Sequence, residues 1–355
     1  MLTRFEVQNF RGFEHLAVES LARVNLIAGK NNVGKTALLE AIFLHLGWHN
    51  PLLPLRVNSL RGVEWLSTQP GEAWGWLFCD RKLTSTIVLR SQDERGQTQN
   101  VEIALNWRDQ MIAAEGMLRD PSSGYLTTTG DVPRELLIRH AAASGQEHES
   151  RAQITEEGQF SIRPAAEESP NVAVYLGATG RSVRSDVDRF SELQRLGKVE
   201  EFVDALRILE PRLARVAVLT TGGIPVLHAN IGLSEWIPLP LLGEGMTRFA
   251  AILLAFVAAK EGGVLLIDEI ENGLHHSVLE RVFGVVATAA RAYDVQVFAT
   301  THNWECIFAA HHAFARSGLY DFCFHRLDRL GAEIKAVSFT QTNLQIAIEH
   351  ELEVR

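Results

Sequence analysis

Eight residues near the N-terminus have the types and the spacing that bind phosphate groups. Gly29 to Thr36 read GKNNVGKT, and glycines at both ends of such a loop let successive backbone N–H groups surround an anion. A lysine at position 35 can reach terminal phosphates, and the hydroxyl of Thr36 can ligate Mg²⁺. The pattern is that of a P-loop and predicts a site for ATP and Mg²⁺. We expect the nucleotide to contact Gly29, Lys30, Asn31, Asn32, Val33, Gly34, Lys35, Thr36 and Ala37.

Two carboxylates follow a wholly apolar run much later in the chain. Val264 to Ile267 read VLLI, and Asp268 and Glu269 come next. A buried strand cannot hide two charges, so both must emerge at its carboxyl end, where parallel sheets bind ligands. Asp268 suits indirect coordination of Mg²⁺, and Glu269 suits activation of an attacking water.

A second apolar run ends in hydroxyl groups and a histidine. Val295 to Ala299 are followed by Thr300, Thr301 and His302. From a neighbouring strand end, His302 could contact the γ-phosphate or the attacking water. The sequence therefore predicts Lys35, Glu269 and His302 as the catalytic residues.

The elements that must position these residues follow from the hydrophobic pattern. Val24 to Ala28 are predicted to form a buried strand, and Thr36 to Leu46 have apolar residues at helical spacing. Towards the C-terminus, the two strands described above alternate with helices that begin near Met246, His276 and Trp304. Such alternation indicates a parallel sheet with helical crossovers, whose strands end at one edge.

The middle of the chain has a different pattern. Alternating runs and polar stretches between residues 48 and 170 predict an antiparallel β-rich lobe, and the absence of sustained heptads argues against a long coiled coil. The predicted fold is an α/β P-loop NTPase, an ABC-type ATPase head with a mainly parallel core sheet. We expect one domain, 1–355, in which the nucleotide-binding core comprises 1–47 and 171–355 and the lobe, 48–170, is inserted.

Composition and charge indicate which classes of protein are compatible with this sequence. The 355 residues are 46% hydrophobic, with a formal net charge of −9 and a pI of about 5.8, so the overall field does not favour nucleic acid. The arginines at 181, 184, 189 and 195 alternate with acidic residues, which indicates a solvated helix face. No leader pattern or membrane-spanning run is present, and the three cysteines show no zinc spacing. These features predict a soluble cytoplasmic protein without a membrane partner.

The motifs resemble those of a known family. Gly29 to Thr36, Leu266 to His275 and Ala299 to His302, with Asn9 to Phe13 near the start, are similar to AAA-type ATPases of the ABC superfamily related to the OLD (overcome lysogenisation defect) nucleases. RecF and SMC heads are more distant relatives of that group. The resemblance covers about 1–47 and 171–310. OLD nucleases carry a TOPRIM domain after the ATPase, and the residues beyond His302 are too few for one, so nuclease activity in this chain is not expected.

The resemblance implies a homodimer that sandwiches ATP between two copies. The segment that would complete the partner's site is Leu242 to Met246, LGEGM, in which Gly245 could offer a backbone N–H to the γ-phosphate. It departs from the LSGGQ of transporter subunits, because the serine is missing and Glu244 adds a negative charge. Glu271, Asn272 and Gly273 lie at the position of the family's D-loop and are expected at the dimer seam.

Three functions remain open at this point. The preferred one is an ATP-dependent dimeric switch for a separate effector, possibly a nuclease in antiviral defence. The alternative is a RecF-like DNA-repair ATPase that binds duplex DNA as an ATP dimer, although the negative charge argues against it. The third is the ATPase subunit of a membrane transporter, against which the unusual LGEGM segment weighs.

Overall fold

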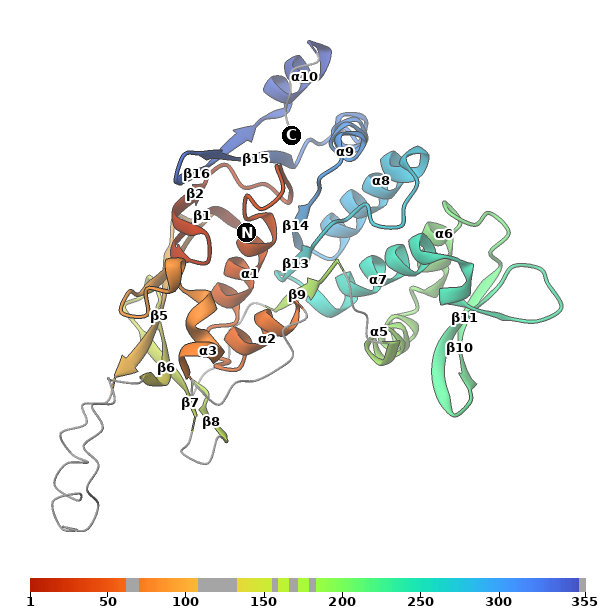
Figure 1. Ribbon diagram of the computed structural model, residues 1–355. Helices are drawn as coiled ribbons and strands as arrows, with labels where there is room; N and C mark the ends of the chain where they lie inside the picture. Colours follow the sequence, from red (N-terminus) through yellow and green to blue (C-terminus); the bar gives the residue numbers. More distant parts are fainter. Residues whose placement is uncertain (62–69, 108–132, 155–158, 166–171, 179–182, 351–355) are drawn as a thin grey trace, which may run out of the picture.

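The computed structural model describes most of the chain. The described residues are 1–61, 70–107, 133–154, 159–165, 172–178 and 183–350. Arg181 and residues 108–132 of the expected lobe lie outside them. Three β-sheets and the helices packed on them make up this part of the chain (Figure 1).

The central sheet has six strands and is mostly parallel. Its order is β16 (Glu333–Phe339), β15 (Phe322–Leu330), β3 (Val24–Gly29), β14 (Gln296–Thr300), β13 (Val264–Ile267) and β9 (Ala173–Leu176). The β15–β16 pair is antiparallel, whereas the other neighbouring strands run parallel. Strands β3, β14 and β13 are buried along their whole length, which explains their continuous apolar sequence. Because these three strands are parallel neighbours, their carboxyl ends meet at one edge.

The second sheet is antiparallel and has seven strands. Its order is β2 (Phe13–Val18), β1 (Leu2–Phe10), β4 (Ile87–Asp93), β5 (Thr98–Trp107), β6 (Pro133–Ala141), β7 (Glu147–Ile154) and β8 (Phe160–Arg163). The sheets therefore do not divide the chain at residue 48. Strand β1 pairs with β4 from Leu2↔Asp93 to Gln8↔Val88, so the first two strands belong to the antiparallel sheet. The expected division into core and inserted lobe remains a proposal about folding units.

Helix α1 (Lys35–Leu46) lies between the two large sheets. Its residues Leu38, Leu39 and Ile42 pack in one hydrophobic cluster with Phe298 of the central sheet and Leu89 of the antiparallel sheet. Sheets on both sides explain why α1 has buried residues around most of its circumference. Two shorter helices, α2 (Leu53–Ser59) and α3 (Pro70–Trp74), follow in the same region (Figure 1).

The opposite face of the central sheet is covered by helices. Alternate residues of β3, β13 and β14 point into a second hydrophobic cluster there. The covering helices are α5 (Val183–Arg195), α6 (Val199–Leu206), α7 (Glu244–Ala259), α8 (His276–Ala292) and α9 (Trp304–Arg316). The central sheet therefore has α1 and the antiparallel sheet on one face and helices on the other.

Two regions differ from the sequence-based expectations. The core region expected to form a mainly parallel sheet also contains a separate antiparallel sheet of β10 (Arg215–Thr221), β11 (Ile224–Asn230) and β12 (Ile237–Pro238). Near the C-terminus, β15, β16 and α10 (Gln341–Glu349) were not anticipated. Strand β15 pairs with β3 and extends the central sheet beyond the P-loop strand.

Other expectations from composition can be compared with the described residues. Arg189 and Arg195 each lie near an acidic residue three positions earlier on α5, at 3.8 and 3.1 Å, as expected for a solvated helix face. Cys79, Cys306 and Cys323 are free and buried. Within the described ranges, no helix is both long and apolar enough to cross a bilayer, and no cluster of three or more metal-binding side chains is found.

Two fully buried histidines make the fold sensitive to acid. His45 on α1 contacts the Ser91 hydroxyl at 2.8 Å, and His325 on β15 lies 2.8 Å from the Ser338 hydroxyl. Burial lowers the pKa of each imidazole to about 3, whereas an unfolded chain titrates near about 6.5. The unfolded state therefore binds more protons as pH falls below about 6.5, and each histidine costs about 1.4 kcal/mol of stability per pH unit.

Thermal unfolding at pH 7.5 and pH 5.0 tests this expectation. The unfolding temperature should fall by several degrees at the lower pH, and His45→Gln should reduce the difference between the two values. The exposed residue His276 supplies a control, His276→Gln, that should leave the difference unchanged. Equal unfolding temperatures at the two pH values would contradict the assignment.

Candidate active site

The loop between β3 and α1 has the backbone that its glycines predicted. Gly29 has φ 144° and Gly34 has φ 106°, angles that favour glycine. Space is also restricted, because a Cβ on Gly34 would lie 2.6 Å from the ring of Phe13 and one on Gly29 would lie 2.5 Å from the Leu327 carbonyl oxygen. The turn near Phe13 and strand β15 therefore enclose the loop, and helix α1 begins directly after it at Lys35.

The Lys35 side chain lies across this loop. Its Nζ donates to the carbonyl oxygens of Gly29 at 2.8 Å and Lys30 at 3.2 Å. Burial lowers the pKa of Lys35 below its ordinary value, and the charges of three nearby carboxylates, Asp268, Glu269 and Glu271, offset part of that effect. The amine of the P-loop and the acidic strand end therefore share one electrostatic environment.

Asp268 links the P-loop helix to two strands. Its carboxylate is buried, and each of its two oxygens lies 3.1 Å from the Thr36 hydroxyl. The Thr300 hydroxyl donates to Oδ1 at 2.6 Å. Thr36 is on α1 and Thr300 ends β14, so residues more than 230 positions apart meet at this carboxylate. The group of hydroxyl and carboxylate oxygens is of the kind that Mg²⁺ prefers.

Glu269 is held in an uncommon backbone conformation. Its φ is 50°, in the left-handed region of the backbone that few residues other than glycine adopt. Its N–H donates to the Thr300 hydroxyl at 2.8 Å, and Asn272 Nδ2 donates to its carboxylate at 2.9 Å. Several contacts therefore fix a strained residue at the predicted position, a feature that often accompanies functional sites.

Arg248 stabilises the same turn from the helical side. Its buried guanidinium donates to the carbonyl oxygens of Asp268 and Glu269 and, at 2.7 Å, to that of Gly177. Sequence reasoning did not identify Arg248 as part of the site. The available signal was a charged residue in helix α7 directly before a run, 249–259, that is wholly apolar.

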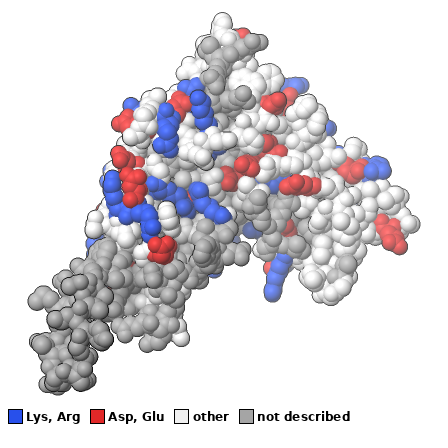
Figure 2. Space-filling model, in the orientation of Figure 1, with Lys and Arg blue, Asp and Glu red and all other residues white. Residues whose placement is uncertain are grey.

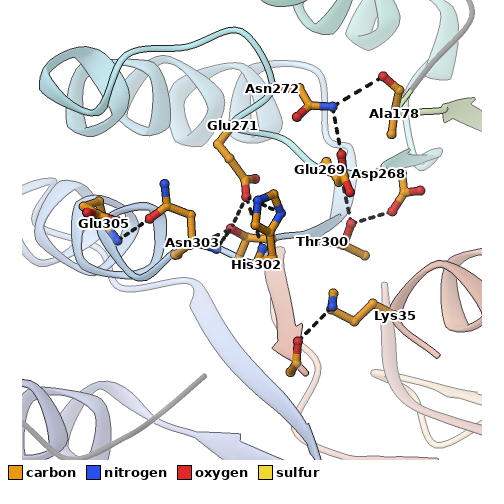
Figure 3. Close-up of polar contacts among 12 residues, drawn as sticks. Lys35, Ala178, Asp268, Glu269, Glu271, Asn272, Thr300, His302, Asn303 and Glu305 are labelled. Atoms are coloured by element: carbon orange, nitrogen blue, oxygen red, sulfur yellow. Dashed lines mark hydrogen bonds and ion pairs between the residues drawn. The ribbon is translucent and has the colours of Figure 1, made fainter. Parts of the chain in front are cut away.

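His302 lies at the end of β14 and contacts Glu271. Its backbone N–H donates to Glu271 Oε1 at 3.1 Å, and its Nδ1 lies 3.3 Å from the same oxygen. About half of its side chain, 55%, is exposed. Figure 3 shows Lys35, Asp268, Glu269, Thr300 and His302 around the carboxyl edge of the central sheet, as the three motifs predicted.

The D-loop positions have partners within one copy of the chain. The side chain of Glu271 is buried and accepts hydrogen bonds from Thr301 and His302. Asn272 likewise points back to Glu269 (Figure 3). The expectation that Glu271, Asn272 and Gly273 lie at a dimer seam remains a proposal.

Gly245 has a structural role within one copy. It lies in the first turn of α7, and a Cβ there would come 2.2 Å from the carbonyl oxygen of Gly273. The backbone of α7 therefore packs directly on the turn that follows the acidic residues. Contact with a nucleotide bound by a second copy remains a proposal.

Substitution of Gly245 by alanine should be destabilising. The added methyl must displace backbone atoms of the Gly273 turn, and such overpacking costs about 1–3 kcal/mol. Gly284 provides the matched control, because a Cβ there meets no described atom within 4 Å and its helix, α8, favours alanine by up to about 1 kcal/mol. The unfolding temperature of Gly245→Ala should be lower than that of the parent, and that of Gly284→Ala should be equal to it or higher. Equal unfolding temperatures of the two variants would contradict the close packing of Gly245 on the Gly273 turn.

Comparisons with known proteins agree with this geometry. Residues 24–305 match the family described as "AAA domain, putative AbiEii toxin, Type IV TA system". The chain belongs to this family. A Helicobacter pylori (strain ATCC 700392 / 26695) protein described as an ATP/GTP phosphatase is 22% identical over 339 residues, which cover 86% of each chain. RecF of Desulforudis audaxviator (strain MP104C), a DNA replication and repair protein, is 45% identical over 49 residues, 14% of each chain.

Solved SMC heads have the same fold. The SMC head bound to the C-winged helix domain of ScpA superposes with a TM-score of 0.51 at 12% identity, covering 98% of this chain and 99% of that one. An SMC head with an extended coiled coil, bound to the C-terminal domain of ScpA and derived from Pyrococcus furiosus, gives 0.50 at 11% identity and covers 99% of each. The chain therefore carries the AAA domain of its family in a fold shared with SMC heads.

Proposed function

We propose that this chain binds Mg-ATP at the carboxyl edge of its central sheet and hydrolyses it there. The observation that carries the proposal is the contact between the Thr36 hydroxyl and both oxygens of Asp268 at 3.1 Å. It joins the P-loop to the acidic strand end, and the shared edge is where parallel sheets bind ligands. The description of the H. pylori relative supports nucleotide hydrolysis.

Binding is assigned to the P-loop and its helix. The loop backbone and the N-terminal end of α1 receive the phosphate charge, and Lys35 Nζ exchanges its carbonyl partners for phosphate oxygens. Thr36 and Asp268 would hold Mg²⁺, since their oxygens already converge. When bound, the ion supplies positive charge next to the β- and γ-phosphates.

Hydrolysis is assigned to the residues beside this pocket. Glu269 accepts a proton from the attacking water, and His302 contacts the γ-phosphate or that water. In the present structure one oxygen of the Glu269 carboxylate accepts from Asn272 at 2.9 Å, which leaves the other oxygen to accept the proton. Thr300 and Arg248 hold the backbone of Glu269 in place.

The biological role proposed for this hydrolysis is a dimeric switch. ATP bound between two copies, with Gly245 of each copy facing the nucleotide of the other, would hold the dimer closed, and hydrolysis would open it. We assign the output to a separate effector, such as a nuclease in antiviral defence, and the OLD-like subtype to the chain itself. The motif resemblance supports this assignment, and the SMC-head fold is compatible with it.

Phosphate release by the purified protein is the direct test. Activity should require Mg²⁺, and ATP and GTP should be compared because the H. pylori description mentions both. If neither ATP nor GTP is hydrolysed in the presence of Mg²⁺, the proposed enzymatic activity is contradicted. If the chain acts on a separate effector, the product of a neighbouring gene should co-purify with it and change its hydrolysis rate. Identical rates with and without that product, together with the absence of a stable complex, would argue against a switch.

A DNA-repair role remains the alternative. The short match to RecF favours it, while the net charge of −9 does not. Figure 2 shows basic side chains on one part of this face with acidic ones interleaved, rather than one continuous basic surface. Salt-dependent binding of duplex DNA that appears with Mg-ATP and is lost without it would favour this alternative.

A further inference from the structure

The buried carboxylate of Glu271 has no assigned role in the nucleotide pocket, and it is not a solvated group of the surface. Its side chain is only 6% exposed, and burying a carboxylate is costly unless other groups stabilise its charge. Its Oε1 accepts from the Thr301 hydroxyl at 2.7 Å and from the His302 N–H at 3.1 Å. Within the described part of the chain, Oε2 has no hydrogen-bond partner. An apolar residue would fill this space at lower cost, so the charge calls for an explanation.

The imidazole of His302 supplies one. Its Nδ1 lies 3.3 Å from the same Oε1 that binds the His302 backbone. A carboxylate offers only lone pairs, so this contact favours the ring form with its proton on Nδ1 over the form that would face Oε1 with a second lone pair. In the neutral ring, the proton on Nδ1 leaves Nε2 as the acceptor, facing away from Glu271. Two contacts to one oxygen restrict both the backbone and the ring.

The charged neighbours of Glu271 fit this arrangement. Lys35 is within electrostatic reach across the nucleotide pocket. The charge of Glu271, together with burial, raises the pKa of the Cys306 thiol on α9, which keeps that group neutral. Besides the Thr301 hydroxyl, Lys35 and His302 can therefore interact favourably with the Glu271 charge, and both belong to the proposed site.

We propose that Glu271 is a positioning residue for His302. It fixes the tautomer protonated at Nδ1 and directs Nε2 towards the nucleotide, so that the turn before α8 sets the geometry at the end of β14. This assignment rests on the proposed function for its effect on hydrolysis. Its effect on the His302 ring exists without nucleotide and can be measured independently.

Glu271→Gln tests the proposal with little change in shape. We expect kcat for Mg-ATP to fall at least about tenfold, with KM within about twofold and an unfolding temperature no lower than that of the parent. The matched control is Glu305→Gln, which removes an exposed carboxylate three positions after His302 and should retain the parent kcat. In the His302→Ala background, Glu271→Gln should produce no further loss, because both changes remove one interaction.

Nitrogen chemical shifts of His302 separate failure of this inference from failure of the enzymatic proposal. At pH 8 in the absence of nucleotide, the parent should show a ring protonated at Nδ1, and Glu271→Gln should shift the population towards the Nε2-protonated form. Unchanged shifts in the variant would overturn the inference even if ATP is hydrolysed. The expected shifts in a protein without ATPase activity would support the positioning and reject the function.

Discussion

Lys35→Ala is expected to abolish measurable binding of Mg-ATP, with Kd raised at least about 100-fold. The lysine amine is the basic group that lies across the loop, within hydrogen-bond distance of two loop carbonyls. Removing one partner of a partly buried, hydrogen-bonded charge pair costs about 3–5 kcal/mol, which corresponds to a factor of roughly one hundred to a few thousand in affinity. The remaining carboxylates, Asp268, Glu269 and Glu271, would also repel the phosphates without an opposing charge.

Isothermal titration of nucleotide into the parent and variant proteins measures this effect. Lys82→Ala is a suitable control, because Lys82 is exposed and forms an ion pair at 3.4 Å with Asp80, which is also exposed. That control should bind with the parent affinity. A Lys35→Ala protein that bound Mg-ATP within threefold of the parent would show that the phosphates lie elsewhere.

Glu269→Gln should stop turnover while leaving nucleotide binding intact. The amide has the shape of the carboxylate and can still accept from Asn272, whose Nδ2 now lies 2.9 Å away, but it cannot accept a proton from water. Loss of a general base lowers the rate by about 10² to 10⁴. Because the phosphate-binding loop is untouched, Kd for Mg-ATP should remain within about threefold.

Single-turnover hydrolysis and nucleotide titration separate these two effects. Glu261→Gln, an exposed carboxylate just before β13, controls for loss of charge and should turn over at the parent rate. Hydrolysis by Glu269→Gln at the parent rate would remove this residue from the mechanism, and loss of binding would indicate that Glu269 supports the pocket rather than the chemistry.

The positions of the motif residues could be predicted because local patterns determine them. A continuous apolar run that ends in Asp268 and Glu269 must be a buried strand, and parallel neighbours must end at the same edge. The contact between Thr36 and Asp268 at 3.1 Å is the three-dimensional result of those two rules. The backbone conformation of the loop glycines could be predicted in the same way, since Gly34 has the positive φ that its position requires.

The features that could not be predicted depend on contacts between distant segments. The pairing of β1 with β4 depends on hydrogen-bonding edges that no local pattern records, and it placed the first strands in the antiparallel sheet. Arg248 has no motif of its own, because its partners are backbone carbonyls of a turn about 20 residues away. The partners of Glu271 within the chain, Thr301 and His302, follow a different strand, so no local pattern indicated them.

The molar mass of Glu269→Gln in solution, with and without Mg-ATP, tests the central claim most directly. If Lys35, Asp268, Glu269 and His302 form one ATP site that closes between two copies, light scattering should give about 40 kDa without nucleotide and about twice that with it, since one chain is 39.5 kDa. Addition of Lys35→Ala to the same protein should prevent the change. A mass that stays at one chain while ATP is demonstrably bound would contradict the dimeric switch.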